Sequence, residues 1–128
     1  MLRNHNPGAI APAFSRYSLG VEAPAQARWL HVSGQVGVEP DGAFADGPEA
    51  QMEAAWRNVL AILESAGMGP GDLVKVTAYL TRAEDTGLYR EVRDRMLAGA
   101  EPASTLLVIT ALAHPDWLVE IEAVAASA

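Results

Sequence analysis

Residues 48–66 read PEAQMEAAWRNVLAILESA, and the apolar side chains of this stretch recur at spacings of three and four. Such spacing places them along one face of an α-helix. Pro48 suits the first helical turn, and Gly67 suits a left-handed C-terminal cap. The apolar face needs a sheet to pack against, and it consists of Met52, Ala55, Trp56, Val59, Leu60 and Leu63.

A second helical pattern runs from Asp85, a residue type favoured at the N-cap, to Gly99, a residue type favoured after the last turn. One face of this helix is apolar and carries Leu88, Tyr89, Val92 and Met96. The other face is charged, and we expect it to meet solvent with Arg90, Glu91, Arg93, Asp94 and Arg95.

Two segments alternate apolar and polar residues with a period of two, which is typical of a strand with one buried face. In residues 29–38 we expect the inward set to be Leu30, Val32, Val36 and Val38, opposite His31, Ser33 and Gln35. In residues 73–81 we expect the inward set to be Val74, Val76, Ala78 and Leu80, opposite Lys75, Thr77 and Tyr79.

The last third of the chain predicts two more strands. Residues 105–112 are almost continuously apolar, as in a buried strand, and residues 118–125 alternate apolar residues with two glutamates. The turn residues His114-Pro115-Asp116 lie between them and predict a hairpin. A shorter strand is expected over about residues 14–21, before a turn that contains Pro24.

The resulting order is strand, strand, helix, strand, helix, strand, strand, which predicts a single α+β domain over residues 1–128. Two helices can cover only one face of a mixed sheet. Several strands nevertheless carry Val, Leu, Ile or Ala on both faces. We therefore expect the uncovered face to pack against another subunit.

Charge and composition exclude several classes of partner. Nine Lys and Arg against sixteen Asp and Glu give a formal net charge of −7, which repels nucleic acid and anionic membrane surfaces. The absence of cysteine excludes disulfides and thiol nucleophiles. The first twenty residues lack the apolar run of a signal peptide, so we expect a cytoplasmic protein.

Common catalytic motifs are also missing. His5, His31 and His114 do not form a metal-ligand spacing, so we expect no metal. The glycines of residues 67–71 follow a helix and precede a strand, the reverse of a phosphate-binding loop. No G-x-S-x-G elbow is present, which argues against a serine hydrolase.

The segment Val119-Glu120-Ile121-Glu122 places two carboxylates on one face of a strand. Partial burial would make either carboxylate a candidate base or water-orienting group. Alternatively, both are solvated or paired with arginines of a neighbouring subunit. These residues alone leave the two interpretations open.

Six short segments form an ordered set along the chain: Tyr17-Ser18-Leu19-Gly20-Val21, Val32-Ser33-Gly34-Gln35, Glu64-Ser65-Ala66-Gly67-Met68, Asp72-Leu73-Val74-Lys75-Val76-Thr77, Glu101-Pro102-Ala103-Ser104-Thr105 and Val119-Glu120-Ile121-Glu122-Ala123. This set resembles the RidA/YjgF family of imine and enamine deaminases over about residues 6–125.

The resemblance implies a chorismate-mutase-like fold and a homotrimer, in which three sheets form a central β-barrel with the helices outside. It implies a ligand cleft between each pair of subunits, where imino acids are hydrolysed to keto acids and ammonia without a metal or organic cofactor. Glu120 then corresponds to the catalytic glutamate that positions the attacking water. The substrate-binding set includes Tyr17, Ser33, Gly34, Arg90, Ser104 and Thr105.

One departure from the family pattern concerns substrate binding. The family has Pro-Ala-Arg-Ser, with an arginine that holds the substrate carboxylate, where this chain has Pro102-Ala103-Ser104-Thr105. A serine hydroxyl cannot replace a guanidinium that forms two parallel charge-assisted bonds. Arg90, where the family often has asparagine, and Arg16, where it often has proline, are the candidate replacements. His114 and Trp117 lie near the family cleft and are further candidates for ligand contact.

Two functions of different classes therefore follow from the sequence. The first is a RidA-like hydrolase of an imine or enamine, with specificity altered by Ser104. The second is a trimer that binds a small metabolite without converting it, or acts in a chaperone-like way. A ribonuclease is a third choice, because the charge of −7 disfavours RNA binding.

Overall fold

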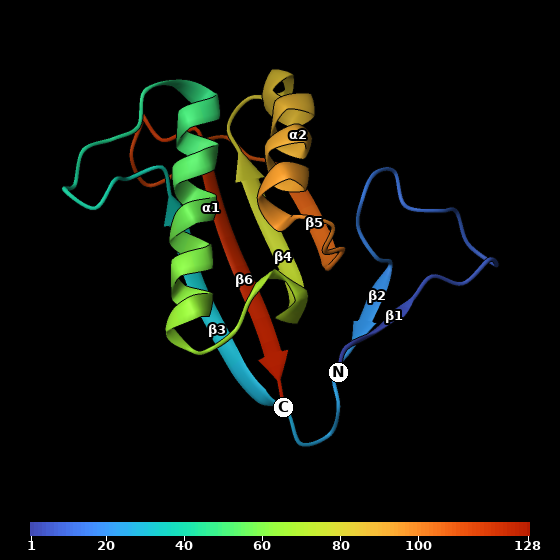
Figure 1. Cartoon of the computed structure of the whole chain (residues 1–128). Helices are drawn as coiled ribbons and strands as arrows, with labels where there is room; N and C mark the ends of the chain where they lie inside the picture. The colour runs from blue at the N-terminus through green and yellow to red at the C-terminus, as the bar shows by residue number, and fades with distance from the viewer.

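The computed structural model describes all 128 residues and has both helices on one face of a four-stranded sheet (Figure 1). The helices are α1 (Gly47–Ser65) and α2 (Thr86–Leu97). The strand order across the sheet is β3 (Arg28–Val36), β6 (Val119–Ser127), β4 (Leu73–Leu80) and β5 (Ala103–Val108). Only the β4–β5 pair is parallel, so the sheet is mixed and the α+β class is confirmed.

A small separate hairpin holds the N-terminal residues beside this sheet (Figure 1). It consists of β1 (Arg3–His5) and β2 (Gly20–Glu22), so the strand expected over residues 14–21 is confined to its last part. The preceding Ser18 makes other bonds: its hydroxyl donates to the Glu101 carbonyl at 2.6 Å, and its backbone pairs with Ala103. The hairpin loop is thereby fixed to the start of β5.

The ends of α1 follow the local chemistry of the sequence. Pro48 lies in the first turn, where its missing N–H costs no helical hydrogen bond. After the last turn Gly67 has a φ of 71°, and the Met68 N–H donates to the Leu63 carbonyl at 2.9 Å. The left-handed glycine cap that the sequence predicts is confirmed.

Helix α2 shows one expected and one unexpected feature. Asp85 occupies the N-cap position, but its carboxylate accepts hydrogen bonds from the Arg82 guanidinium at 2.8 and 3.0 Å instead of capping the helix. Arg93, expected on the solvent face, is only 4% exposed. The reason is its ion pair with Asp94 and its hydrogen bond to Ser15, which draw it beneath the N-terminal loop.

The core lies between the helices and the sheet. Helix α1 packs on β3 and β6, and it also contacts α2. The apolar face of α1 includes Trp56, which is fully buried. Its ring stacks against that of Tyr89 of α2, with 6.5 Å between ring centroids. The sheet contributes a facing layer of fully or almost fully buried side chains: Val76, Ala78, Leu80, Val119, Ile121, Ala123 and Ala125.

The predicted hairpin between the last two strands is wrong, because β4 lies between β5 and β6. Strand β5 is instead the parallel partner of β4, reached through the crossover helix α2. It forms an edge of the sheet, and Leu107 and Val108 are 45% and 50% exposed. Its apolar composition therefore does not reflect burial within one chain.

Two β-bulges also change the predicted inward sets. Between Val32 and Gln35 the register of β3 shifts by one residue, so that Val36 lies opposite Glu120 on the uncovered face. A second shift between Leu73 and Lys75 replaces Val74 by Leu73, which is 2% exposed, in the core. A one-residue shift exchanges the two faces of a strand, which explains both errors.

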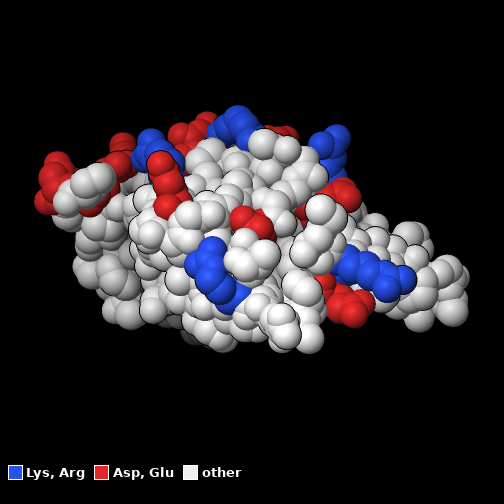
Figure 2. Space-filling model, turned by 60° about the horizontal axis from the view of Figure 1, so that its bottom comes forward, with Lys and Arg blue, Asp and Glu red and all other residues white.

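The surface carries no broad basic region on the face shown in Figure 2, where Lys and Arg side chains lie apart from one another. In the chain as a whole, several basic side chains pair with acidic ones, as in Arg57 with Glu39 and Arg95 with Glu53. Neither α-helix combines the length and the apolarity needed to cross a bilayer.

The contact of α1 with the sheet predicts a large effect of truncating Leu63, which is fully buried. Leu63→Ala should lower the free energy of unfolding by about 2 to 5 kcal/mol, since it removes apolar contacts and leaves a cavity. Urea denaturation at a fixed protein concentration measures this. Ile10→Ala, at a position that is 58% exposed, is the control and should change stability by less than about 0.5 kcal/mol.

Candidate functional site

Glu120 lies on the uncovered face of β6, because its neighbours Val119 and Ile121 fill the core under the helices. Its side chain passes directly over Gly34 of β3. A Cβ atom at Gly34 would lie 1.8 Å from the Oε2 atom of Glu120, so no other residue fits at this position without displacing the carboxylate. Gly34 and Glu120 are thus brought together within one chain.

The Glu120 carboxylate lines a hollow of about 250 Å³, called here the glutamate hollow, whose residues are Tyr79, Ile109, Leu112, Glu120 and Glu122. Within it the Tyr79 hydroxyl donates a hydrogen bond to Glu122. That hydrogen bond, and then burial and the charges of Glu122 and Glu120, raise the pKa of Tyr79 above its usual value. Tyr79 is therefore a neutral phenol at physiological pH.

A second hollow, of about 160 Å³, lies between α2, β5 and the N-terminal loop. We call it the arginine pocket, and its residues are Phe14, Ser15, Tyr17, Arg90, Arg93, Ser104 and Leu106. It brings together three of the sequence-predicted residues: Tyr17, Arg90 and Ser104. No acidic side chain lines it.

Two guanidinium groups, those of Arg90 and Arg93, line the arginine pocket. Arg93 is held by Asp94 at 2.9 Å and by the Ser15 hydroxyl at 3.2 Å, which fixes its position. Arg90 is half-buried and takes part in none of the ion pairs of the chain. The pocket therefore favours an anionic group of a small ligand.

The two hollows lie on different sides of the sheet. Ser104 pairs with Val76, which faces the helices, whereas Thr105 pairs with Thr77, which in turn pairs with Glu122 on the uncovered face. Thr105 accepts a hydrogen bond from Lys75 on that face. Within one chain, Tyr17 is thus not brought to Glu120.

The remaining predicted residues line neither hollow. Ser33 is exposed on β3, next to Gly34, and Arg16 is exposed beside Tyr17. His114 and Trp117 pack edge-to-face against Phe44, with ring centroids 4.8 Å and 5.9 Å from that of Phe44. This cluster shapes the loop before β6.

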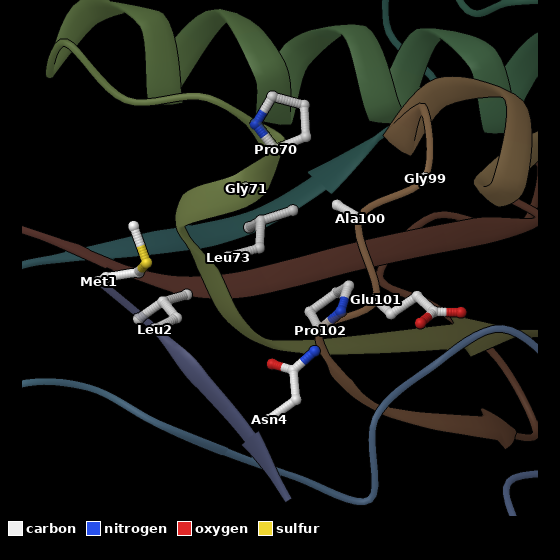
Figure 3. A pocket seen from close by; sticks show the side chains of 10 residues that line it. All are labelled: Met1, Leu2, Asn4, Pro70, Gly71, Leu73, Gly99, Ala100, Glu101 and Pro102. Atoms are coloured by element: carbon white, nitrogen blue, oxygen red, sulfur yellow. The ribbon is translucent and has the colours of Figure 1, made fainter.

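A third hollow, of about 260 Å³, lies between β1 and the turns that follow the two helices (Figure 3). Its lining is mostly apolar side chains and glycines, and Glu101 is the one charged side chain among them. It contains none of the predicted site residues. No group of three or more His, Asp or Glu side chains is placed to hold a metal ion.

Comparison with known proteins places this geometry in a family. The family model described as Endoribonuclease L-PSP matches residues 8–127. The RutC family protein of Pyrococcus horikoshii is 32% identical over 121 residues, covering 93% of this chain and 90% of that protein. The 2-iminobutanoate/2-iminopropanoate deaminase of Salmonella typhimurium is 32% identical over 123 residues, covering 93% and 90%.

Solved structures agree with the sequence matches. The Rid family protein YyfB from Yersinia pestis, described as of unknown function, has a TM-score of 0.90 at 30% identity and covers 98% of both chains. Escherichia coli TdcF with bound serine has a TM-score of 0.75 at 28% identity, covering 95% of this chain and 93% of its own. The ordered motifs, the two-layer fold and these matches together show that the chain belongs to the RidA/YjgF family.

Proposed function

We propose that the protein hydrolyses a small imine or enamine, with Glu120 as the catalytic residue. The observation that carries this proposal is the carboxylate itself: it is half-buried, lies over Gly34, lines the glutamate hollow and is in none of the ion pairs of the chain. A free carboxylate of this kind can accept a proton from water. Relatives named as deaminases support the reaction class.

The reaction needs one water molecule per substrate. Glu120 takes a proton from the water while the oxygen forms a bond to the carbon of the C=N group, and Glu120 then passes that proton to the nitrogen, which gives a carbinolamine. In the second step the carbinolamine hydroxyl proton passes through Glu120 to the nitrogen as the C–N bond breaks, which releases ammonia, leaves a carbonyl group and restores the Glu120 carboxylate. General base assistance of this kind contributes about 10²- to 10⁴-fold to the rate. No cofactor is required by these steps.

Substrate binding is the second part of the proposal. With Ser104 at the position of the family arginine, we assign the substrate carboxylate to Arg90, whose guanidinium lines the same pocket as Ser104 and Tyr17. Arg90 approaches from α2, and therefore from a different direction than a side chain on β5. A displacement of about 1 Å can cost roughly 10²-fold in rate, so specificity should differ from that of relatives with the arginine.

Assembly would join the two hollows. We propose that the protein is a homotrimer in which the glutamate hollow of one subunit meets the arginine pocket of the next. The uncovered face supports this, because the large apolar side chains of Trp29 on β3 and Leu107 on β5 are 53% and 45% exposed there. The arginine pocket and the Glu120 carboxylate also lie apart within one chain, which favours a cleft shared between subunits.

Sedimentation equilibrium tests the assembly. At micromolar concentration the protein should sediment with three times the 13.5 kDa mass of one chain. The exposed apolar side chains of the sheet provide the driving force. A monomeric mass at this concentration would falsify the trimer and the shared cleft.

Replacement of the proposed base tests the chemistry. Glu120→Gln keeps the size of the side chain but cannot accept the proton, so ammonia release should fall by about 10²-fold or more. A panel of imines generated in place by amino-acid dehydratases and oxidases supplies the substrates. Glu91→Gln, at an exposed position on α2, is the matched control and should retain full activity. Equal rates for Glu120→Gln and the unmodified protein would rule out the mechanism.

A pair of opposite substitutions tests the binding mode on 2-iminobutanoate made by a threonine dehydratase. We expect weak turnover by the unmodified protein, a loss in Arg90→Ala and a gain in Ser104→Arg. Each charge-assisted bond is worth about 1.5 to 3 kcal/mol, which corresponds to roughly 10- to 100-fold in kcat/KM. If Ser104→Arg gains nothing and Arg90→Ala loses nothing, the carboxylate does not bind in the arginine pocket.

The altered pocket also favours a second function, in which the trimer binds a small metabolite without converting it. The specific observation is Ser104, because it removes the family guanidinium while the pocket itself remains. A thermal-shift screen followed by turnover assays separates the two functions. A ligand that raises Tm strongly and is not consumed supports binding, and a ligand that is consumed supports hydrolysis.

A further inference from the structure

Tyr79 lies beside both carboxylates of the uncovered face. In the antiparallel pairing of β4 and β6, Tyr79 is directly opposite Glu120, and Thr77 is directly opposite Glu122. Directly opposite side chains are the nearest neighbours across a sheet. The Tyr79 hydroxyl nevertheless donates to Glu122, the diagonal neighbour, and not to Glu120.

Because Tyr79 donates to Glu122, the Glu120 oxygens receive no hydrogen bond from the Tyr79 hydroxyl. A phenol has one hydrogen to donate, and Glu122 accepts it. Glu120 is left without a hydrogen bond from Tyr79, and Gly34 beneath it contributes no side chain. Its oxygens are therefore free to accept a hydrogen bond from water in the glutamate hollow.

Without Glu122, the same hydroxyl has another acceptor within the hollow. Tyr79 remains protonated at neutral pH in that case too, because burial and the charge of Glu120 still raise its pKa. Rotation toward the opposite strand would bring its hydrogen to Glu120. A hydrogen bond donated to a carboxylate stabilises the charged form and occupies a lone pair, and both effects weaken the carboxylate as a base.

We propose that Glu122 is a positioning residue, which holds the Tyr79 hydroxyl away from Glu120 and so keeps that carboxylate available to the attacking water. The inference rests on the proposed role of Glu120 as the base. It assigns to the second carboxylate of the strand a role different from that of the first: Glu122 contacts Tyr79, and Glu120 contacts the reactants.

The other titratable groups of this face, Lys75 and His31, both lie opposite Val124, diagonal to Glu122 and farther from Glu120. On β4, Lys75 donates to Thr105 of β5. On β3, His31 lies opposite Val124, beyond Glu122 along β6. Strand β5 carries no titratable side chain on this face, where its residues are Ala103, Thr105 and Leu107. Tyr79 and Glu122 are therefore the titratable groups in the hollow with Glu120.

A double-mutant cycle tests the proposal by ammonia release. Glu122→Val removes the acceptor, and kcat/KM should fall by about tenfold while the acidic limb of its pH profile moves to lower pH. Adding Tyr79→Phe removes the hydroxyl that would reach Glu120, so the double variant should recover to within about threefold of the unmodified protein. Glu122→Gln keeps a carbonyl acceptor and should also retain activity.

Thr77→Val, a change on the same face opposite Glu122, is the control and should leave the pH profile unchanged. Circular dichroism and sedimentation establish that each variant folds and assembles. If Tyr79→Phe fails to restore a folded Glu122→Val variant, or if Glu122→Val has no effect, Glu122 does not act through Tyr79.

A second measurement does not depend on turnover. In protein labelled at the tyrosine ring carbons, NMR titration follows the pKa of Tyr79. In Glu122→Val this pKa should stay above the usual phenol value, because Glu120 accepts the hydrogen, and it should fall when Glu120→Gln is added. A usual value already in Glu122→Val overturns the positioning role. If no variant releases ammonia but the titration behaves as expected, the proposed reaction fails and the contact between Tyr79 and the two carboxylates stands.

Discussion

The candidate site depends on one constraint: alternate residues of β6 face the core and the uncovered side of the sheet. The odd-numbered residues from Val119 to Ala125 fill the core under the helices, so the intervening Glu120 and Glu122 must face the other way. A register shift of one residue would place both carboxylates in the core, at a cost of several kcal/mol for each unpaired charge. The packing that holds α1 and α2 on the sheet therefore also fixes the position of the proposed catalytic group.

The local parts of this fold could be predicted from sequence, whereas the long-range parts could not. Helix α1 was predictable because Pro48, the apolar spacing and Gly67 act within a few residues of one another. The strand order depends on which strands pair across α2, and the short apolar run of β5 contains no information on this. The bulges of β3 and β4 likewise result from fitting two strands to β6, so alternation alone placed Val36 and Val74 on the wrong side.

The candidate site shows the same division. Alternation indicated that Glu120 and Glu122 share a face, and the family motifs indicated Tyr17, Gly34 and Ser104. Arg93 was missed because its charge suggested a solvent position. The signal was nevertheless present in the spacing, since residue 93 lies four positions after the buried Tyr89 and so falls on the same helix face. A charged residue at a core position of a helix indicates a polar partner, which here is Asp94 together with Ser15.

The division of the site between two hollows has a physical reason. A pocket with two guanidinium groups and a hollow with two carboxylates would neutralise each other as ion pairs if they met directly within one chain. Glu120 would then be held by an arginine and would be a poorer base, and Arg90 would be unavailable to a substrate carboxylate. The sheet keeps the two groups on opposite sides of the chain. Assembly across subunits, as proposed, could then separate them by the length of a substrate, whose anionic end faces the arginines and whose reacting carbon faces the carboxylate.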